Sequence, residues 1–394
     1  MSAIKPKQPK QSKRTAPHPA SVSLCPPRRP LPPHALVLAP MVGASELAFR
    51  LLCRRHGAQL CYTPMMHSSR FASDAAYRAA ELCTAQGDGP LVAHFCGNDG
   101  ATLLAAARLA ERASNVVAVD LNLGCPQRSA HSGHYGAFLC ADAAGRERVL
   151  GMVSTLAHGL SVPVFCKIRL LDEGEAETVA FAQALERAGC ALLAVHGRLR
   201  GSPMHRRSGP ADLAQVAAVK SALAIPVLTN GNVRCSGELL AALAATGADG
   251  VMSAEGALDD PAIFAKAIAH AHAERSRLAA ERRRAKALKA QRRDGRHLTE
   301  EEAAVVRGRK AAKATLAQIK AISSALPPPP SAAPPPPFAL AEQYIGLVEE
   351  HPPPGGAAAL LSHAVFHLRR LCRTPPSQSD PWDCRQDCDD ALAC

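Results

Sequence analysis

Short apolar runs alternate with longer stretches of helical period from Ala35 to about Pro261. Continuous apolar runs of this length are typical of strands buried on both faces, and several are preceded by Gly or Pro, which suits short turns. The runs occupy 35–41, 59–65, 90–96, 116–123, 163–170, 192–198, 225–233 and 250–255. Stretches rich in Ala and Leu with helical spacing lie between them, as at 99–113, 176–188, 212–222 and 236–246. Eight such strands alternating with helices predict an α/β fold, a parallel (β/α)8 TIM barrel.

A different pattern begins after the predicted barrel. Residues 274–320 predict a long charged helix interrupted near Asp294-Gly295, and the proline-rich segment 327–337 predicts a stiff, extended linker. Helical spacing returns at 338–372 and is broken by prolines and glycines at 352–356. We therefore expect a disordered basic tail at 1–33, a barrel at 34–273, a charged helical insertion with its linker at 274–337, a small all-helical domain at 338–373, and a disordered acidic tail containing cysteines at 374–394.

The positive charge of the chain is concentrated outside the predicted barrel. Residues 275–320 hold 15 Lys or Arg against five Asp or Glu, and residues 1–45 hold seven Lys or Arg and no acidic residue. The net charge of the whole chain is +12, so the remainder is mildly acidic. This asymmetry is consistent with an anionic partner such as nucleic acid, and equally with a solvated helix and a solvated tail.

The composition also bears on compartment and metal binding. No apolar run approaches the roughly 20 residues that a membrane-spanning helix needs. The 14 cysteines are scattered along predicted strands and helices, so we expect a reduced intracellular protein rather than a disulfide framework. Cys384, Cys388 and Cys394 lack a clear fourth ligand, so we expect free thiols and no bound metal. The basic, acid-free start permits an organelle transit peptide, but its prolines argue against the amphipathic helix that import favours, so we expect the cytoplasm, the nucleus or both.

The candidate chemistry lies where the predicted strands end. The run DLNLGCPQ at 120–127 places Asn122 after the fourth strand and Cys125 on a Gly-Cys-Pro turn, so that the thiol is offered at a strand end. Lys167 lies inside an apolar strand, where an ammonium without a partner is costly. The other unusual strand ends are Pro40-Met41-Val42, His94, Arg169, His196-Gly197-Arg198, Asn230-Gly231-Asn232 and Ala254-Glu255-Gly256. A parallel barrel brings these residues to one face, where active sites of this architecture lie.

The glycine turns after the seventh and eighth strands favour a phosphate site, because their unobstructed backbone N–H groups would lie beside helix N-termini. A phosphate there would place the rest of a cofactor over the barrel mouth, which suggests FMN with its ring near Lys167 and His196. Each feature alone has a plainer explanation. An Asn-Gly-Asn turn is most often only a turn, and Cys125 taken alone is more often a packed, inert thiol. The coincidence of such residues at so many strand ends favours a functional site.

These motifs resemble those of the tRNA dihydrouridine synthase family, specifically the eukaryotic class that acts on D-loop uridines 16 and 17. The resemblance covers about 35–265 in family order, and the segment 340–371 is more weakly similar to the family's helical tRNA-binding domain. The matching motifs are LAPMV at 38–42, YTPMMH at 62–67, DLNLGCPQ at 120–127, GHYGAFL at 133–139, KIR at 167–169, VHGR at 195–198, TNGNV at 229–233 and SAEG at 253–256.

The resemblance implies an FMN enzyme that reduces uracil to dihydrouracil in tRNA, with NADPH or NADH as the reductant. Cys125 would be the proton donor. The residues that would hold the flavin are Pro40, Met41, Val42, His94, Lys167 and His196, with Asn122 beside the flavin and uracil. Its phosphate end would be held by Asn230, Gly231, Asn232, Ala254, Glu255 and Gly256. Arg169 and Arg198 would lie near the RNA.

The implied chemistry agrees with these residue types. Hydride delivered to C6 of uracil builds negative charge toward C5 and O4, so an acid must protonate C5. A thiol ordinarily has a pKa of about 8.5 and is mostly protonated at neutral pH, so it serves that role without a lowered pKa. A uridine in a stacked loop must be splayed out to reach a barrel mouth. The loop carrying His134 and Tyr135 would act as a lid.

Four departures from the family pattern stand out. His94 occupies the place of the family's usual Gln, which contacts the flavin, and Leu199 replaces a common Thr. The segment 201–207 also differs from the usual loop, and the charged insertion at 274–320 is additional. We hypothesise that the insertion adds RNA affinity through phosphate contacts, so that deleting 277–320 would weaken tRNA binding and flatten its salt dependence.

Two other functions are consistent with parts of the sequence. A flavin barrel that reduces a small molecule, such as a dihydroorotate or enoate reductase, would not need the basic insertion or the helical C-terminal segment. A catalytically impaired RNA-binding homologue would not need Cys125. The replacement of the family's usual Gln by His94 is nevertheless consistent with such a homologue. The preferred reading is a monomer that acts on tRNA and binds no membrane.

Overall fold

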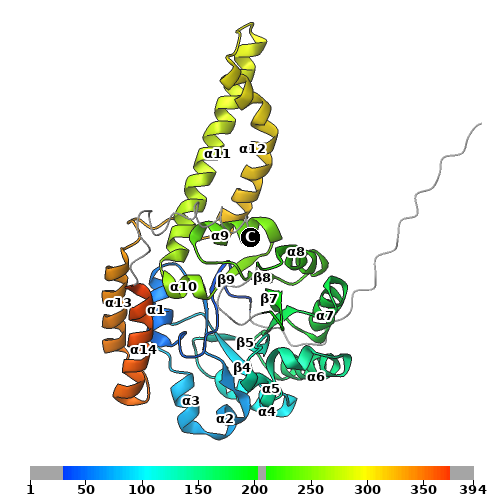
Figure 1. Cartoon of the computed structure of the whole chain (residues 1–394), viewed down its shortest axis with the longest axis vertical. Helices are drawn as coiled ribbons and strands as arrows, with labels where there is room; N and C mark the ends of the chain where they lie inside the picture. Colours follow the sequence, from blue (N-terminus) through cyan, green and yellow to red (C-terminus); the bar gives the residue numbers. More distant parts are fainter. Residues whose placement is uncertain (1–29, 203–209, 373–394) are drawn as a thin grey trace, which may run out of the picture.

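The computed structural model describes residues 30–202 and 210–372. Eight parallel strands form a closed barrel in the order β2-β1-β9-β8-β7-β6-β5-β4, closed by pairing between β2 and β4 (Figure 1). The strands are β1 (Leu36–Leu38), β2 (Leu60–Tyr62), β4 (Leu91–Cys96), β5 (Val116–Leu123), β6 (Val164–Leu170), β7 (Leu192–Leu199), β8 (Val227–Asn230) and β9 (Gly250–Ser253). A two-residue strand, β3 (Met66–His67), pairs with the end of β4. The predicted (β/α)8 barrel is therefore confirmed.

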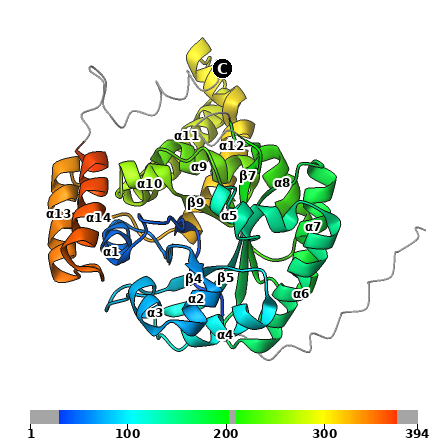
Figure 2. The same ribbon diagram turned by 60° about the horizontal axis from the view of Figure 1, so that its bottom comes forward.

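Helices surround the barrel, and shorter elements lie at the carboxyl ends of the strands (Figure 2). The outer helices are α1 (Leu47–Arg55), α4 (Gly100–Ala110), α6 (Ala143–Gly159), α7 (Glu175–Ala188), α8 (Leu213–Ala222), α9 (Ser236–Thr246) and the first part of α11 (Ile263–Arg293). The shorter elements are α2 (Ser68–Ser73), α3 (Ala75–Glu81), α5 (Arg128–Ser132), the 3-10 helix η1 (Gly136–Cys140) and α10 (Glu255–Asp259). Helix starts follow local capping chemistry, as at α4, where the Asp99 carboxylate accepts the Thr102 N–H.

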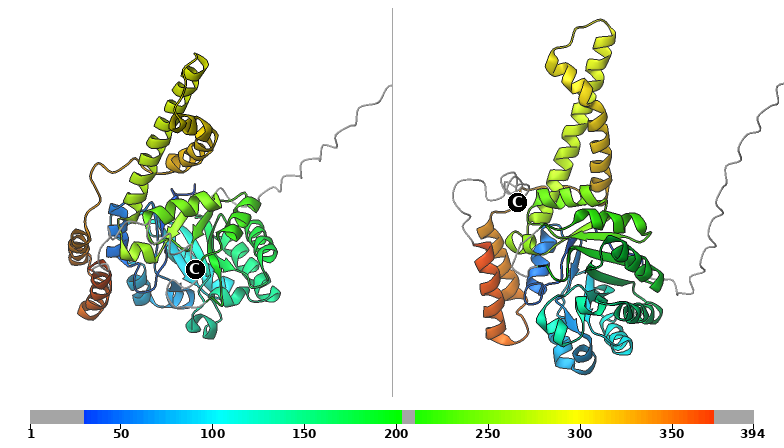
Figure 3. Two further views of the ribbon diagram at one scale, coloured as in Figure 1. Left: turned by 45° about the horizontal axis from the view of Figure 1, so that its top comes forward. Right: turned by 45° about the vertical axis from the view of Figure 1, so that its right-hand side comes forward.

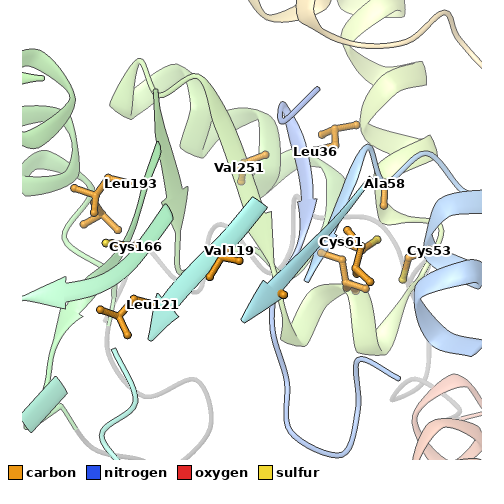
Figure 4. Close-up of a cluster of buried hydrophobic side chains, with 14 of the residues drawn as sticks. Leu36, Cys53, Ala58, Cys61, Val119, Leu121, Cys166, Leu193 and Val251 are labelled. Atoms are coloured by element: carbon orange, nitrogen blue, oxygen red, sulfur yellow. The ribbon is translucent and has the colours of Figure 1, made fainter. Parts of the chain in front are cut away.

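Alternating strand residues build two separate cores, because successive side chains point to opposite faces of a strand. One set fills the barrel with residues such as Val37, Leu60, Val92 and Phe165. The other set packs beneath the helices. Figure 4 shows part of it, including Leu36, Cys53, Ala58, Cys61, Val119, Leu121, Cys166, Leu193 and Val251. Burial on both faces explains why the strands are continuously apolar in the sequence.

Two further helix pairs follow the barrel. The second part of α11 forms a hairpin with α12 (Glu300–Ala325) that projects from the barrel (Figure 3). The break between them lies at Asp294-Gly295, where the sequence predicts an interruption. The second pair is α13 (Pro337–Glu350) and α14 (Gly356–Leu371), which lies beside α1. The helical C-terminal region is thus present, and the domain boundaries remain predictions.

The second pair is attached to the barrel by several polar contacts, two of which are made by one carboxylate. Glu46, just before α1, accepts a hydrogen bond from the Tyr344 hydroxyl at 2.8 Å and lies 3.2 Å from Nε2 of His367. The His367 ring is fully buried and stacks on Phe49, with ring centroids 4.3 Å apart. These contacts join residues that are about 300 positions apart in the sequence. They hold the C-terminal helices against the outside of the barrel.

Several predictions fall wholly or partly outside the described ranges. The two tails, most of segment 201–207, and Cys384, Cys388 and Cys394 belong to this group. Within the described ranges nine cysteines are free thiols, and Cys235 is disulfide-bonded. No helix in the described part of the chain is both long and apolar enough to cross a membrane.

Candidate functional site

The interior positions of the barrel change from apolar to polar toward the carboxyl ends of the strands. On β5 the inward residues run from Ala118 to Asp120 and Asn122, and on β6 they run from Phe165 to Lys167. Asn122 is paired in register with Lys167 on the neighbouring strand. The same change on β7 leads from Ala194 to His196. Polar groups from four neighbouring strands, β5 to β8, therefore converge at one end of the barrel, as the sequence predicts.

Cys125 is held on its turn by a side chain from the preceding strand. The Asn122 side-chain oxygen accepts hydrogen bonds from the backbone N–H groups of Gly124 and Cys125, each at 2.9 Å. Arg169 donates from Nε to the Gly124 carbonyl at 2.9 Å. Two neighbouring strands therefore fix both sides of the turn, and the thiol remains partly exposed.

The glycine-rich loop that follows closes against the same cysteine. The Ala137 N–H donates to the Cys125 carbonyl at 3.0 Å. Gly136 has φ +67°, and a Cβ there would lie 2.7 Å from the Cys125 carbonyl oxygen. Only glycine allows this approach without strain, which is the structural reason for glycine at this position. The loop carrying His134 and Tyr135 is thus packed against the thiol-bearing turn.

Lys167 and His196 carry the main electrostatic features of the barrel mouth. Burial lowers the pKa of Lys167 to about 8, and the nearby Arg169 adds to the effect. The Lys167 ammonium makes no hydrogen bond to any residue in the described ranges. Burial and the charges of Lys167, Arg169 and Arg198 hold the pKa of His196 well below its ordinary value, so its imidazole is neutral at pH 7. The site therefore combines one available cation with a neutral ring.

Arg198 connects β7 to the loop after β8. Its guanidinium lies 3.0 Å from Nε2 of His196 and donates to the Asn232 side-chain oxygen at 2.7 Å. Asn232 has φ +55° and follows Gly231 at φ +115°. A Cβ at Gly231 would lie 2.8 Å from Cβ of Ala211 and 3.2 Å from Cδ2 of His196. The loop backbone therefore lies close to the imidazole, as a cradle for a ligand requires.

His94 is paired inside the barrel rather than standing alone at a strand end. Its Nδ1 lies 2.6 Å from Oδ2 of Asp120, and both residues are buried. Burial raises the pKa of the Asp120 carboxyl, although the hydrogen bond with His94 opposes that shift. The other carboxylate oxygen of Asp120 and the Tyr62 hydroxyl are buried and have no partner among the described residues. A polar layer therefore lies directly below the mouth.

Beside Cys125 lies a second group of polar and aromatic side chains. The Cys96 sulfur lies 3.3 Å from Nδ1 of His67, and the His67 ring contacts Tyr135 edge-on with centroids 5.2 Å apart. Burial and the nearby Cys125 raise the pKa of Cys96 to about 12, so this thiol stays protonated. A cavity of about 400 Å³ adjoins this group, lined by residues that include Ser68, Ser69, Asn98, Thr102 and Ser129.

The remaining predicted site residues occupy varied positions. Asn230 is buried and donates to the Met252 carbonyl, which ties β8 to β9. Gly256 lies against the backbone of Val233 and Arg234, where a Cβ would lie 2.5 Å from the Val233 carbonyl oxygen. The Glu255 carboxylate is turned to Arg370 of α14 at 2.7 Å, and Ala254 precedes it at the start of α10. Pro40 and Met41 are partly buried, whereas Val42 is 70% exposed.

The donor set at the mouth fits a flavin. Lys167 offers an ammonium without a hydrogen-bond partner among the described residues, and His196 offers a neutral ring beside the glycine turn at Gly231. These groups suit an electron-rich ring with an anionic chain. The sequence does not predict that Asp120, Gly136 and Arg169 hold the site. Residues alternate between the two faces of a strand, and positions 94 and 120 on adjacent strands fall on the same face. That alternation is the one sequence signal that could have identified Asp120.

The fold and site define a class: a closed parallel (β/α)8 barrel with a thiol, a cation and a neutral imidazole at the carboxyl ends of its strands. The chain belongs to the dihydrouridine synthase family, because residues 37–326 match the family described as Dihydrouridine synthase (Dus).

Individual relatives are similar over the barrel. A mouse protein named tRNA-dihydrouridine(16/17) synthase [NAD(P)(+)]-like is 50% identical over 233 residues, which cover 58% of this chain and 47% of that protein. The Saccharomyces cerevisiae tRNA-dihydrouridine(16/17) synthase [NAD(P)(+)] is 41% identical over 58% of this chain and 53% of its own length. A human tRNA-dihydrouridine(20a/20b) synthase [NAD(P)+]-like protein is 38% identical over 58% and 70%. The chain thus spans about half the length of the first two.

Proposed function

We propose that this protein is a tRNA-dihydrouridine synthase that reduces the C5–C6 bond of D-loop uridines, at positions 16 and 17. FMN would be its bound cofactor, and NADPH or NADH its reductant. The observation that carries the proposal is the Cys125 thiol, held on its turn by Asn122 within electrostatic range of Lys167. The names of the more similar relatives support positions 16 and 17 over 20a and 20b.

The cofactor would be held by residues that already converge at the mouth. Lys167 and His196 would contact the flavin ring, together with Pro40, Met41 and Val42, and His94 would lie below them. The loops at Asn230-Gly231-Asn232 and Ala254-Glu255-Gly256 would hold the phosphate end. When bound, the flavin would supply the hydride that adds to C6 of uracil.

Cys125 would complete the reduction with a proton. Adding one hydride to C6 leaves the uracil with a negative charge that needs one proton at C5. The Cys125 S–H bond would break, the proton would pass to C5, and the thiolate would regain a proton from solvent. Asn122 and Arg169 would fix the position of the sulfur through the turn. The neutral His196 would add no competing positive charge.

The substrate would reach the thiol as an unstacked nucleotide, because a base within a stacked loop cannot enter the barrel mouth. Arg169 and Arg198 would add positive charge near the RNA, although each already binds protein acceptors. The loop carrying His134 and Tyr135 would cover the site. A monomeric state and a cytoplasmic or nuclear location stay predictions from the sequence.

Complementation tests this function. Dihydrouridine is mapped in tRNA from cells that lack the protein and that then receive the wild type, Cys125→Ala or Cys372→Ala. We expect the wild type and the exposed-thiol control Cys372→Ala to restore positions 16 and 17. Dihydrouridine formation by Cys125→Ala should fall by a factor of about 100 or more, which is the usual contribution of a positioned acid. The purified wild type should also show a flavin absorption spectrum.

Two results would count against the proposal. Full restoration by Cys125→Ala would overturn the acid assignment. A wild-type protein that leaves tRNA unmodified but turns over dihydroorotate would overturn the tRNA substrate and favour a small-molecule reductase.

A further inference from the structure

The distal half of α11 carries a row of positive charge that the proposed reaction does not use. Between 282 and 293 it contains seven Lys or Arg and no acidic residue. Four of these cations, Arg282, Lys286, Lys289 and Arg293, follow one another at spacings of four, three and four. Such spacing places them on one side of a helix. All four are exposed.

These four cations have no counter-ion among the described residues, unlike several other arginines of the hairpin. Arg277 pairs with Glu274 and Glu281, Arg296 with Glu302, and Arg307 with Glu300. Among the described residues, the stripe of four makes no ion pair. Like charges one turn apart repel each other and disfavour the helix. The stripe therefore destabilises this part of the helix, and a row of bound anions would relieve the repulsion.

The stripe is mounted on a packed hairpin rather than on a solvated tail. Leu278, Ala285 and Leu288 of α11 are buried, as is Leu316 of α12. A capping box at Thr299 and Glu302 fixes the start of α12. The four cations are consequently held at fixed spacing, which lowers the entropy cost of binding an extended partner.

The hairpin points away from Cys125. Its second helix ends at Ala325, whose carbonyl accepts from Gln59 Nε2 at 3.3 Å. The Gln59 side chain also accepts from the Leu36 N–H, so this contact lies at the amino ends of β1 and β2. Cys125 lies at the opposite, carboxyl ends of the strands. Figure 1 and Figure 3 show the hairpin projecting outward from the barrel.

We propose that the stripe Arg282-Lys286-Lys289-Arg293 binds the phosphate backbone of a structured RNA, at a surface separate from the barrel mouth. Four point charges in a row match a strand of phosphates. Residues 274–325 contain no Phe, Tyr or Trp on which a base would stack, so the recognition is of backbone and not of sequence. The proposal does not depend on the reaction at Cys125.

A membrane surface is the less suitable anionic partner. Interfacial helices expose an apolar face beside their basic face. In the hairpin the large apolar side chains are turned inward, and no large hydrophobic residue of the described chain that is exposed belongs to α11 or α12.

The test compares two full-length variants with the same change of net charge. The stripe variant is Arg282→Gln, Lys286→Gln, Lys289→Gln and Arg293→Gln. The control variant is Arg277→Gln, Arg296→Gln, Arg307→Gln and Lys320→Gln, which removes four hairpin cations outside the stripe. Affinity for an unmodified tRNA transcript is measured across a salt series. A charge-conserving variant, Arg282→Lys, Lys286→Arg, Lys289→Arg and Arg293→Lys, separates charge from side-chain identity, and circular dichroism checks helicity.

We expect the stripe variant to bind roughly 1,000-fold more weakly near 0.1 M salt, because the slope of log K against log salt falls by about 3 and the two affinities converge near 1 M salt. The control variant should lose less than threefold, and the charge-conserving variant should bind like the wild type. Equal losses in the stripe and control variants would reduce the effect to net charge and overturn the proposal. So would an unchanged affinity of the stripe variant, or stripe-dependent binding to phosphatidylserine vesicles without an effect on RNA. If the stripe variant loses helicity, the charge-conserving variant decides. Because it keeps all four positive charges, its failure to bind RNA would also contradict a phosphate contact.

Discussion

Nδ1 of His94 lies 2.6 Å from Oδ2 of Asp120 in the interior of the barrel, and neither side chain is more than 2% exposed. Replacing His94 with Ala would leave a buried carboxylate without its partner. We expect His94→Ala to lower the free energy of unfolding by about 3 kcal/mol, and His94→Gln to lose much less because the amide still donates. Urea denaturation measures both.

A matched control for that pair is His158→Ala on the exposed surface of α6, where the ring bonds only to Ser154. It should change the free energy of unfolding by less than about 0.5 kcal/mol. Equal effects of His94→Ala and His158→Ala would show that the buried pair contributes nothing specific.

The turn that carries Cys125 depends on one amide. Asn122→Ala removes the acceptor for two backbone N–H groups, at Gly124 and Cys125, and should release the turn. We expect tRNA reduction to fall at least about tenfold in kcat, because a small displacement of a reacting group is costly. Asn115→Ala is the control, since it removes a comparable hydrogen bond to the Ala85 carbonyl before the start of β5. Retention of full kcat by Asn122→Ala would refute the positioning role.

Lys167 is expected to destabilise the protein without cofactor while supporting cofactor binding. Its pKa in the fold is lowered to about 8 from an ordinary 10.5, so below pH 8 the protonated group is disfavoured by folding. Lys167→Met should therefore raise the free energy of unfolding of the flavin-free protein by about 1–2 kcal/mol at pH 7. This gain should fade between pH 8 and about 10.5, where the unfolded lysine also loses its proton.

Thermal denaturation with and without FMN measures both effects of Lys167→Met. The same variant should lose affinity for FMN, which fluorescence titration of the flavin reports. A variant that is less stable than the wild type without FMN at pH 7 would contradict the assigned cost of burial.

The attachment of the C-terminal helices should depend on pH through Glu46. Burial raises the pKa of this carboxyl, but His367 and the hydrogen bonds outweigh burial and the net pKa is lowered from 4.5. A lowered pKa stabilises the fold above about pH 4.5, and this contribution is lost as the pH falls through the lowered value. Glu46→Gln should therefore be less stable than the wild type by about 1–2 kcal/mol at pH 7, with the difference shrinking below pH 4.5.

Tyr344→Phe serves as the companion variant, because it removes one hydrogen bond to Glu46 and leaves the charge. It should cost about 1 kcal/mol and move the loss of stability toward higher pH, because the Tyr344 hydrogen bond helps to lower the pKa of Glu46, whereas Glu46→Gln removes that titration altogether. Denaturation curves at several pH values distinguish the two variants, and a constant difference between Glu46→Gln and wild type at all pH values would be inconsistent with the assigned pKa.

Patterns between near neighbours in the sequence determined much of this protein. The apolar runs predicted the eight barrel strands, because strands covered on both faces must be apolar at consecutive positions. The motifs around Cys125, Lys167 and His196 predicted a site at the carboxyl ends of those strands. Both inferences rely on backbone geometry that a few consecutive residues encode.

Tertiary structure alone decided which side chains meet across distant segments. The position of His94 in the sequence is compatible with contact to a cofactor. The fold instead directs its Nδ1 to Asp120. Glu46 gave no local sign of its contact with His367, which lies more than 300 residues later. The basic hairpin was visible as a charged helix with a break, but its projection from the amino ends of the strands follows from the contact between Gln59 and Ala325. Such contacts depend on how separate elements pack, which periodicity within one element does not encode.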